Sequence, residues 1–155
     1  MFIKTIKLKR PKAGVVGAIV CAVVLIAVVI VTACRLTGTT VYEMKSEAQR
    51  QAFLKEMGWE VSEEYDECKA IEIPKEFNDV YTKYNDLQKQ QGFDLAKYKG
   101  ETAEVYTYRI KNYKGYEKKG EIRANLIVCK GQLIGGDVCS AELDGFMQGL
   151  KKLSK

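Results

Sequence analysis

The chain has 155 residues, with 25 Lys and Arg, 20 Asp and Glu and no His, which gives a formal net charge of +5. Five of the basic residues precede a long uncharged segment, so the rest of the chain has 25 − 5 = 20 basic residues against all 20 acidic ones. A nucleic-acid-binding face needs a basic stripe, and this neutral remainder argues against one. The lack of His excludes His-dependent catalytic triads and His-ligated metal sites.

The uncharged segment has the length of a membrane span. Residues 13–34 carry no charge and consist mostly of Val, Ala and Ile. A helix of about 20 such residues crosses the roughly 30 Å hydrocarbon core of a bilayer. The five positive charges within residues 1–12 predict that this end is cytoplasmic. We therefore expect a single-pass protein of the cell membrane, with a transmembrane or signal-anchor helix at 13–34 and a globular domain outside.

Two alternatives concern the same segment. Residues 31–34, which end in Cys34, resemble the lipobox of bacterial lipoproteins, in which the cysteine is diacylated. An uncleaved anchor and a lipidated Cys34 both leave the same domain tethered outside the cell. Gly14, Ala18 and Ala22 have the small-xxx-small spacing that lets two membrane helices pair, so homodimerisation through this face is a second option. The general abundance of Ala and Gly in membrane helices explains the spacing equally well.

A short polar stretch joins the anchor to the domain. Residues 35–45 are predicted to form a linker, and residues 46–155 number 110, a normal size for one domain that can bury a core. Ser46 and Gln49 fit a capping box, and Gly58 suits the position after a helix end. A helix is therefore expected between Ser46 and Gly58.

The next elements alternate between strand and helix. Residues 68–73 read as a strand that ends at Pro74. From Phe77 to Leu87, large apolar and aromatic residues recur at positions i, i+3, i+4, i+7 and i+10. This spacing predicts an amphipathic helix that ends near Gly92.

The second half of the domain has the composition of β-structure. Residues 101–110 are rich in Thr, Val and Tyr, residues 122–129 alternate in polarity, and Lys130-Gly131 suits a hairpin turn into a strand at 132–138. A polar turn at 112–120 connects the first two of these strands.

The C-terminal segment is expected to be helical. Ser140 can cap a short helix in which Leu143, Phe146, Met147 and Leu150 form the apolar side. The complete order of elements indicates an α+β fold, with an antiparallel sheet packed with two or three helices and preceded by one N-terminal transmembrane helix.

Several short stretches of the domain also resemble a known family. The stretches are Gly58–Val61, Ile73–Phe77, Leu87–Phe93, Gly135–Ser140 and Leu143–Phe146. Their combination resembles the bacterial domain of unknown function 4830 over about residues 46–150. The resemblance implies an envelope protein of Gram-positive type and brings no catalytic residues with it.

The expected outer domain contains an odd number of cysteines, Cys68, Cys129 and Cys139. The predicted hairpin places Cys139 opposite Ile122 and about 20 Å from Cys129, which excludes a disulfide between these two. A disulfide from Cys68 to one of them and three free, buried thiols both remain open.

Few residues suggest catalysis. Cys139 precedes the predicted helix, where a thiol can be activated, but thiol catalysis also needs a base, usually His. Gly135-Gly136 is better explained as a strand bulge or a close backbone approach, and no Gly-Lys-Ser/Thr follows as in a phosphate loop. Asp137 and Asp144 are the carboxylates on which an acid/base enzyme would depend.

Two further clusters are candidates for binding. The acidic residues between Glu60 and Glu67 could hold Ca²⁺, but their spacing does not match an EF-hand and is typical of a solvated face. No metal and no cofactor are therefore expected. Tyr106 and Tyr108 should share one strand face, with Tyr113 and Tyr116 on the adjacent turn, so they could present an aromatic platform. Ordinary packing of Tyr in strands is the alternative.

These patterns favour a membrane-tethered extracytoplasmic binding or interaction module of a bacterial envelope. Its partner would be an envelope protein, a peptide or a cell-wall glycan. The alternatives are a lipoprotein subunit of a membrane complex and, less favoured, a carboxylate-dependent hydrolase.

Overall fold

The computed structural model describes residues 41–116, 121–142 and 145–152. The expected span at 13–34, most of the linker, Cys34 and the Gly14, Ala18 and Ala22 face lie outside these residues. Among the helices that are described, none has the length and apolar character needed to cross a bilayer.

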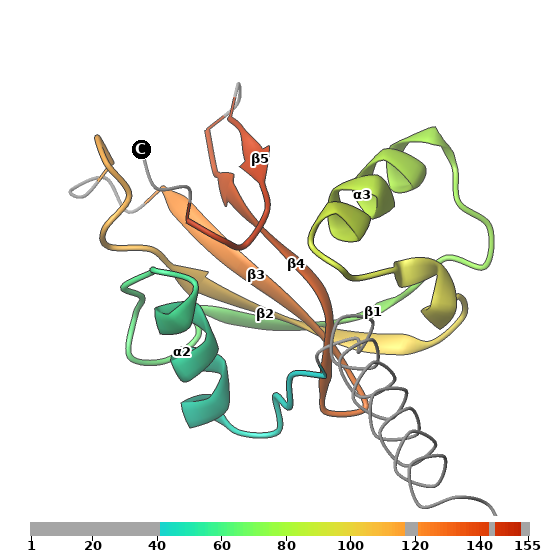
Figure 1. The fold of residues 1–155 in the computed structure, drawn as a ribbon, viewed down its shortest axis with the longest axis horizontal. Helices are drawn as coiled ribbons and strands as arrows, with labels where there is room; N and C mark the ends of the chain where they lie inside the picture. The colour runs from blue at the N-terminus through green and yellow to red at the C-terminus, as the bar shows by residue number, and fades with distance from the viewer. Residues whose placement is uncertain (1–40, 117–120, 143–144, 153–155) are drawn as a thin grey trace, which may run out of the picture. The chain divides into compact units, whose positions relative to one another are not determined.

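The described residues form a five-stranded antiparallel sheet in which the strands lie side by side in chain order (Figure 1). Two α-helices and one short 3₁₀ helix accompany the sheet, which confirms the expected α+β class with an antiparallel sheet. The elements in chain order are α2 (Glu47–Glu56), β1 (Glu67–Glu72), α3 (Asp79–Gln90), η1 (Leu95–Tyr98), β2 (Thr102–Arg109), β3 (Ile122–Cys129), β4 (Gln132–Ser140) and β5 (Met147–Gln148).

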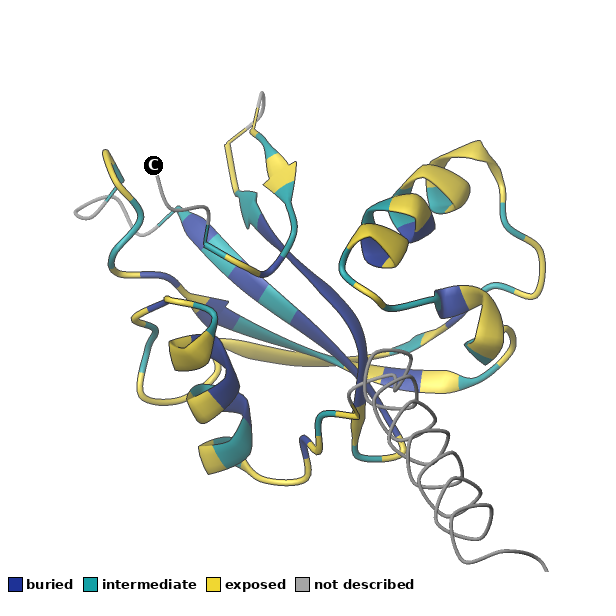
Figure 2. Ribbon diagram, in the orientation of Figure 1, coloured by how far each residue is buried: buried dark blue, intermediate teal, exposed yellow. Residues whose placement is uncertain are grey.

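Two hydrophobic cores lie on opposite faces of the sheet, because successive side chains of a strand point to opposite sides. Ala124 and Leu126 of β3 pack with Leu54 of α2 in one core. Ile127 of β3 packs with Leu95 of η1 in the other, and α3 covers that face as well. Figure 2 shows that β3 and β4 are largely buried between these layers, whereas β1 is exposed.

The helix boundaries follow from the local signals in the sequence. The side chain of Ser46 accepts a hydrogen bond from the Gln49 backbone, and the Gln49 side chain accepts one from the Ser46 backbone, as expected for a capping box. Asn78 caps α3, and its side chain accepts a hydrogen bond from the Tyr81 N–H at 2.8 Å. The predicted helix around residues 77–87 therefore begins two residues later than the pattern suggested.

The expected C-terminal helix is wrong. Ser140 belongs to β4, and Met147 and Gln148 form β5, which pairs with Cys139 and Val138. The turn between the two strands is tight, because a side chain at Gly145 would lie 2.7 Å from the Ser140 carbonyl oxygen. Strand pairing outweighs the helical spacing of apolar residues in this segment.

The end of the predicted linker is part of the fold. The Met44 N–H donates to the Gly131 carbonyl oxygen at 2.8 Å, and the Leu133 N–H donates to the Tyr42 carbonyl oxygen at 3.0 Å. Met44 is buried. Tyr42 to Met44 thus continue the sheet beside the beginning of β4.

A bulge in β4 explains the glycine pair. Val128 pairs with Leu133 but Ile127 pairs with Gly135, which leaves Ile134 as the extra residue. Gly136 also lies so close to the backbone of β3 that a side chain would overlap the Asn125 carbonyl oxygen. Both parts of the expectation for the glycine pair, a bulge and a close approach, are confirmed.

The bulge also changes the register beyond it. Cys139 pairs with Arg123 rather than with Ile122 as expected, and Asp137 pairs with Asn125. Because one extra residue moves the following side chains to the other face of a sheet, Asp137 faces α3 rather than α2.

Candidate functional site

A groove of about 850 Å³ opens between α2, the C-terminal end of α3 and the segment around β5. Figure 1 shows these elements arranged around β4. The volume lies in the range of pockets that hold a small ligand or a few residues of a peptide. The groove is lined by Tyr42, Phe53, Glu56, Met57, Leu87, Gln90, Gln91, Phe93, Met147, Gln148, Gly149, Leu150 and Lys151.

Local features of the chain position the walls of this groove. Phe53 and Met57 are one helical turn apart near the end of α2, so they lie on the same side. Gly92 has a φ of +87°, the left-handed conformation that suits a residue after a helix end, and Phe93 then packs against the α2-side core. Leu150 is fixed by the Trp59 indole N–H, which donates a hydrogen bond to its carbonyl oxygen.

The lining combines apolar side chains with amides. Met147 is 55% exposed, a high fraction for a large apolar side chain, and Met57 adds a second thioether. Methionine side chains are flexible and adapt to apolar partners of different shape. Gln90 and Gln148 supply amide groups that can donate to and accept from a peptide backbone. Apolar side chains and amide groups thus lie together on the walls of the groove.

Two glutamines join the α3 wall of the groove to the sheet. The Gly136 N–H donates to Gln88 Oε1 at 2.8 Å, and Gln91 Nε2 donates to the Gly136 carbonyl oxygen at 3.0 Å. Gln91 Oε1 also accepts from the Leu150 N–H at 2.6 Å. The two glutamines therefore provide hydrogen-bond partners for the backbone N–H and C=O of Gly136 on the outer edge of β4. This position lies between the part of β4 that pairs with Tyr42–Met44 and the part that pairs with β5.

A separate polar cluster lies under α3. Asp137 is only 3% exposed, and its carboxylate accepts hydrogen bonds from the Tyr84 hydroxyl at 2.8 Å and from Asn125 Nδ2 at 3.0 Å. Asn125 Oδ1 in turn accepts from the Thr107 hydroxyl at 2.9 Å. Burial raises the pKa of Asp137 above its usual value, and these two hydrogen bonds oppose the shift in part.

This cluster does not have the geometry of an open acid/base or thiol site. Asp137 is enclosed between β3, β4 and α3, and Asp144 lies outside the described residues. Cys139 lies within β4 rather than before a helix, so no helix dipole activates it. Burial and the neighbouring Asp137 carboxylate both raise the pKa of the Cys139 thiol, which favours the unreactive thiol form.

The four tyrosines proposed as a ligand surface all contribute to the hydrophobic core on the α2 side of the sheet. Tyr108 is fully buried, and Tyr106 on the same face is partly buried beneath α2. Tyr113 stacks on Trp59 with ring centroids 5.7 Å apart, and Tyr116 packs edge-on against Tyr113 at 5.8 Å. Tyr106 and Tyr108 therefore form one pair that contacts Arg50 of α2, whereas Tyr113 and Tyr116 pack on one another beside Trp59.

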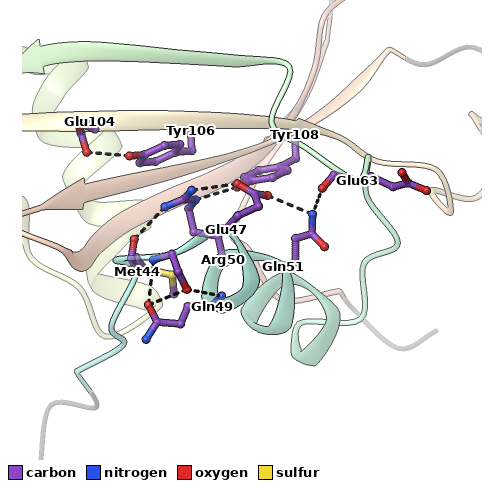
Figure 3. A network of polar contacts seen from close by, with 10 residues as sticks. Met44, Glu47, Gln49, Arg50, Gln51, Glu63, Glu104, Tyr106 and Tyr108 are labelled. Atoms are coloured by element: carbon purple, nitrogen blue, oxygen red, sulfur yellow. Dashed lines mark hydrogen bonds and ion pairs between the residues drawn. The ribbon is translucent and has the colours of Figure 1, made fainter.

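Arg50 organises the first pair and was not among the predicted site residues (Figure 3). Its Nε donates to the Tyr108 hydroxyl at 2.9 Å and its Nη1 donates to the Met44 carbonyl oxygen at 3.0 Å. The guanidinium carbon lies 3.9 Å from the centre of the Tyr106 ring, and Nη2 bonds Glu47 Oε2 at 2.9 Å. One sequence signal could have identified it, because Arg50 occupies an inward position of α2, one turn before Phe53 and Leu54.

The cysteines and the acidic stretch, the remaining candidates from the sequence, are not arranged as a binding or catalytic site in the described residues. All three cysteines are free thiols, as one of the two alternatives expected, but only Cys129 is buried, since Cys68 is exposed and Cys139 intermediate. Within the described ranges, no group of three or more Cys, Asp or Glu side chains is arranged to hold a metal ion. In the acidic stretch, Asp66 forms ion pairs with Arg109 at 3.3 Å and Arg123 at 2.5 Å.

Comparison with known families gives one match. A family model described as Domain of unknown function (DUF4830) matches residues 53–138, which run from the middle of α2 nearly to the end of β4. Comparisons with curated proteins and with solved structures found no match.

Proposed function

Since the chain belongs to the family described as Domain of unknown function (DUF4830), a description that assigns no activity, we propose a function from the geometry of the domain. The protein is a binding module of a bacterial envelope, tethered to the membrane with its globular domain outside the cell. It takes an apolar segment of an envelope protein or peptide into the groove between α2, α3 and β5.

The composition of the groove carries this proposal. Its lining brings apolar side chains from four separate segments, represented by Tyr42, Met57, Leu87 and Met147, around one hollow. Met147 is exposed and Tyr42, Met57 and Leu87 are partly buried, so the hollow presents one accessible apolar side chain with three partly accessible ones around it. The amides at its walls provide the polar groups that a peptide backbone requires.

The sequence of the first 34 residues supports the location. Residues 1–12 carry five positive charges and residues 13–34 carry none, the pattern of an N-terminal cytoplasmic end followed by a span. From Cys34 to Tyr42 the chain extends at most about 28 Å, so a groove that includes Tyr42 serves ligands close to the membrane.

The groove is tested by adding a charge to its wall. The full chain in lipid nanodiscs is panned against a phage-displayed library of random peptides, and we expect enrichment of peptides with apolar residues. Met147→Glu should weaken binding of a selected peptide at least about tenfold, because an unpaired charge in an apolar contact costs more than the 1.4 kcal/mol of a tenfold change.

Val80→Glu is the matched control, because Val80 is 76% exposed, apolar and outside the groove. This control should leave the dissociation constant within about twofold of the wild type. Equal weakening by the two substitutions, or no enrichment of any peptide, would contradict the proposal.

The form of the tether is tested by the intact mass of the protein extracted from bacterial membranes. A full-length mass is expected for the uncleaved anchor. Loss of residues 1–33 with an added lipid mass would show instead that Cys34 is diacylated. A mass that lacks the N-terminal segment and carries no lipid would contradict both forms of the tether.

A further inference from the structure

In the part of the chain that the structure describes, the sheet has an open edge at β1. Among the described residues, β1 pairs only with β2, and every residue from 63 to 70 is exposed. Figure 2 shows β1 as an exposed band beside the buried central strands. An open edge carries unpaired backbone N–H and C=O groups and can add a further strand.

The pairing with β2 fixes which backbone groups face outward. The Ile73 N–H donates to the Glu101 carbonyl oxygen at 2.9 Å, at the pairing position that follows Glu72 opposite Thr102. Hydrogen-bonded positions alternate along an antiparallel strand, so Glu67 and Lys69 also direct their backbone groups toward β2. Cys68, Ala70 and Glu72 therefore direct theirs toward the open edge.

We propose that this edge pairs with β1 of a second copy of the chain, antiparallel, with Cys68 of one copy opposite Cys68 of the other. In this register Glu67 lies opposite Lys69 of the second copy, and Lys69 lies opposite its Glu67. The two side chains are on one face of the strand and already form an ion pair at 2.7 Å within a single chain. Two oppositely charged cross-strand pairs therefore form about the two-fold axis.

The charges of β1 favour this register over the other antiparallel registers in which β1 can pair with β1 of a second copy. A register centred on Lys69 places two lysines opposite one another, and one centred on Glu72 does the same for two glutamates. A register centred on Glu67 also pairs two glutamates, and registers centred on Ala70 or Ile71 form no pair of opposite charge between residues of β1. The register centred on Cys68 is thus the self-complementary one.

Anchoring of both copies in one membrane allows this short β1–β1 interface to form. A single pair of short strands buries too little surface for a stable dimer of free domains. Two copies anchored in the same membrane face one another at a high effective concentration, which lets a weak contact form. This step rests on the membrane tether of the proposed function but not on its groove, so failure of peptide binding leaves it intact.

The test is oxidative crosslinking of the full chain in bacterial membranes with copper(II)-phenanthroline, read by non-reducing electrophoresis and by mass spectrometry of the linked peptides. In the proposed register the two Cys68 Cα atoms lie about 5.5 Å apart, within the range of a disulfide. We expect a Cys68–Cys68 crosslink that is lost in Cys68→Ser.

A matched control moves the thiol by two residues on the same exposed edge. In Cys68→Ser/Ala70→Cys, the two new thiols are about 14 Å apart along the paired strands, so their crosslinking should fall at least about fivefold. Equal crosslinking from positions 68 and 70 would show random collisions and would overturn the proposal.

The charges provide an independent test. Glu67→Lys and Lys69→Glu should each reduce Cys68 crosslinking at least about threefold at low salt, because each places like charges opposite one another. The double exchange Glu67→Lys/Lys69→Glu restores opposite charges and should restore crosslinking. Single variants that crosslink as the wild type does, or a double variant that is not restored, would overturn this register.

Discussion

Replacing Arg50 with methionine is expected to lower the free energy of unfolding of the domain by about 3 kcal/mol. The substitution removes the donors to the Tyr108 hydroxyl and to the buried Met44 carbonyl oxygen, together with the contact over the Tyr106 ring. A buried acceptor left without its donor cannot regain a hydrogen bond from water. Urea denaturation followed by circular dichroism measures the loss.

Lys89→Ala is the control for this prediction. The ion pair of Lys89 with Asp86 is 3.4 Å long, and both side chains are more than half exposed, so its removal should cost less than about 0.5 kcal/mol. A loss below about 1 kcal/mol in Arg50→Met would show that the network in Figure 3 does not hold α2 to the sheet.

Gly136→Ala should also destabilise the domain by about 3 kcal/mol, at the upper end of the usual cost of overpacking. The added methyl group would overlap the Asn125 carbonyl oxygen and would lie 2.9 Å from Leu150 Cδ1. The first of these contacts is with backbone inside the sheet, so it can be relieved only if β3 and β4 move apart. The same urea titration measures the effect.

Gly135→Ala is the control for this prediction. It tests whether any added methyl group at the bulge is destabilising or only one that contacts the β3 backbone. At Gly135, an added methyl group would lie 3.0 Å from Gln88 Oε1 and 3.2 Å from Leu95 Cδ2, both of which are side-chain atoms that can shift. Gly135→Ala should therefore cost clearly less than Gly136→Ala. If the two glycines give equal losses, close packing against the β3 backbone is not the reason for Gly136.

Elements with a strong local signal were predictable from the sequence. The capping box at Ser46 and Gln49 marks the beginning of α2, and the alternation in residues 122–129 gives β3 with its observed bounds. In both cases the signal is contained within a few neighbouring residues. The tertiary contacts of these two elements are consistent with that local signal and do not change their secondary structure.

The C-terminal segment was not predictable in this way. Its apolar residues fit a helical period, but Met147 is held by pairing with Cys139, a partner that no periodicity reveals. Gly145 and Gly149 lie inside the predicted helix and are the local signal against it. The apolar pattern of this segment is compatible with a helix or a strand, and pairing with β4 determines that it forms a strand.

The candidate site depended even more on distant segments. The groove joins residues as far apart in the chain as Tyr42 and Met147, and none of them forms a motif. Tyr108 could be placed on a strand face, but its burial follows from the position of α2 and the inward Arg50. Sequence spacing defines neighbours within an element, whereas a groove arises between elements.

The two sides of the sheet differ in a way that limits how copies can assemble. The outer side of β4 is occupied at its start by Tyr42–Met44, in its middle by Gln88 and Gln91, and at its end by the two-residue β5. Only β1 therefore offers an extended strand for edge-to-edge association among the described residues. If β1 pairs with β1 of a second copy about a two-fold axis, both edges are used, so among the described residues that pairing ends at two copies.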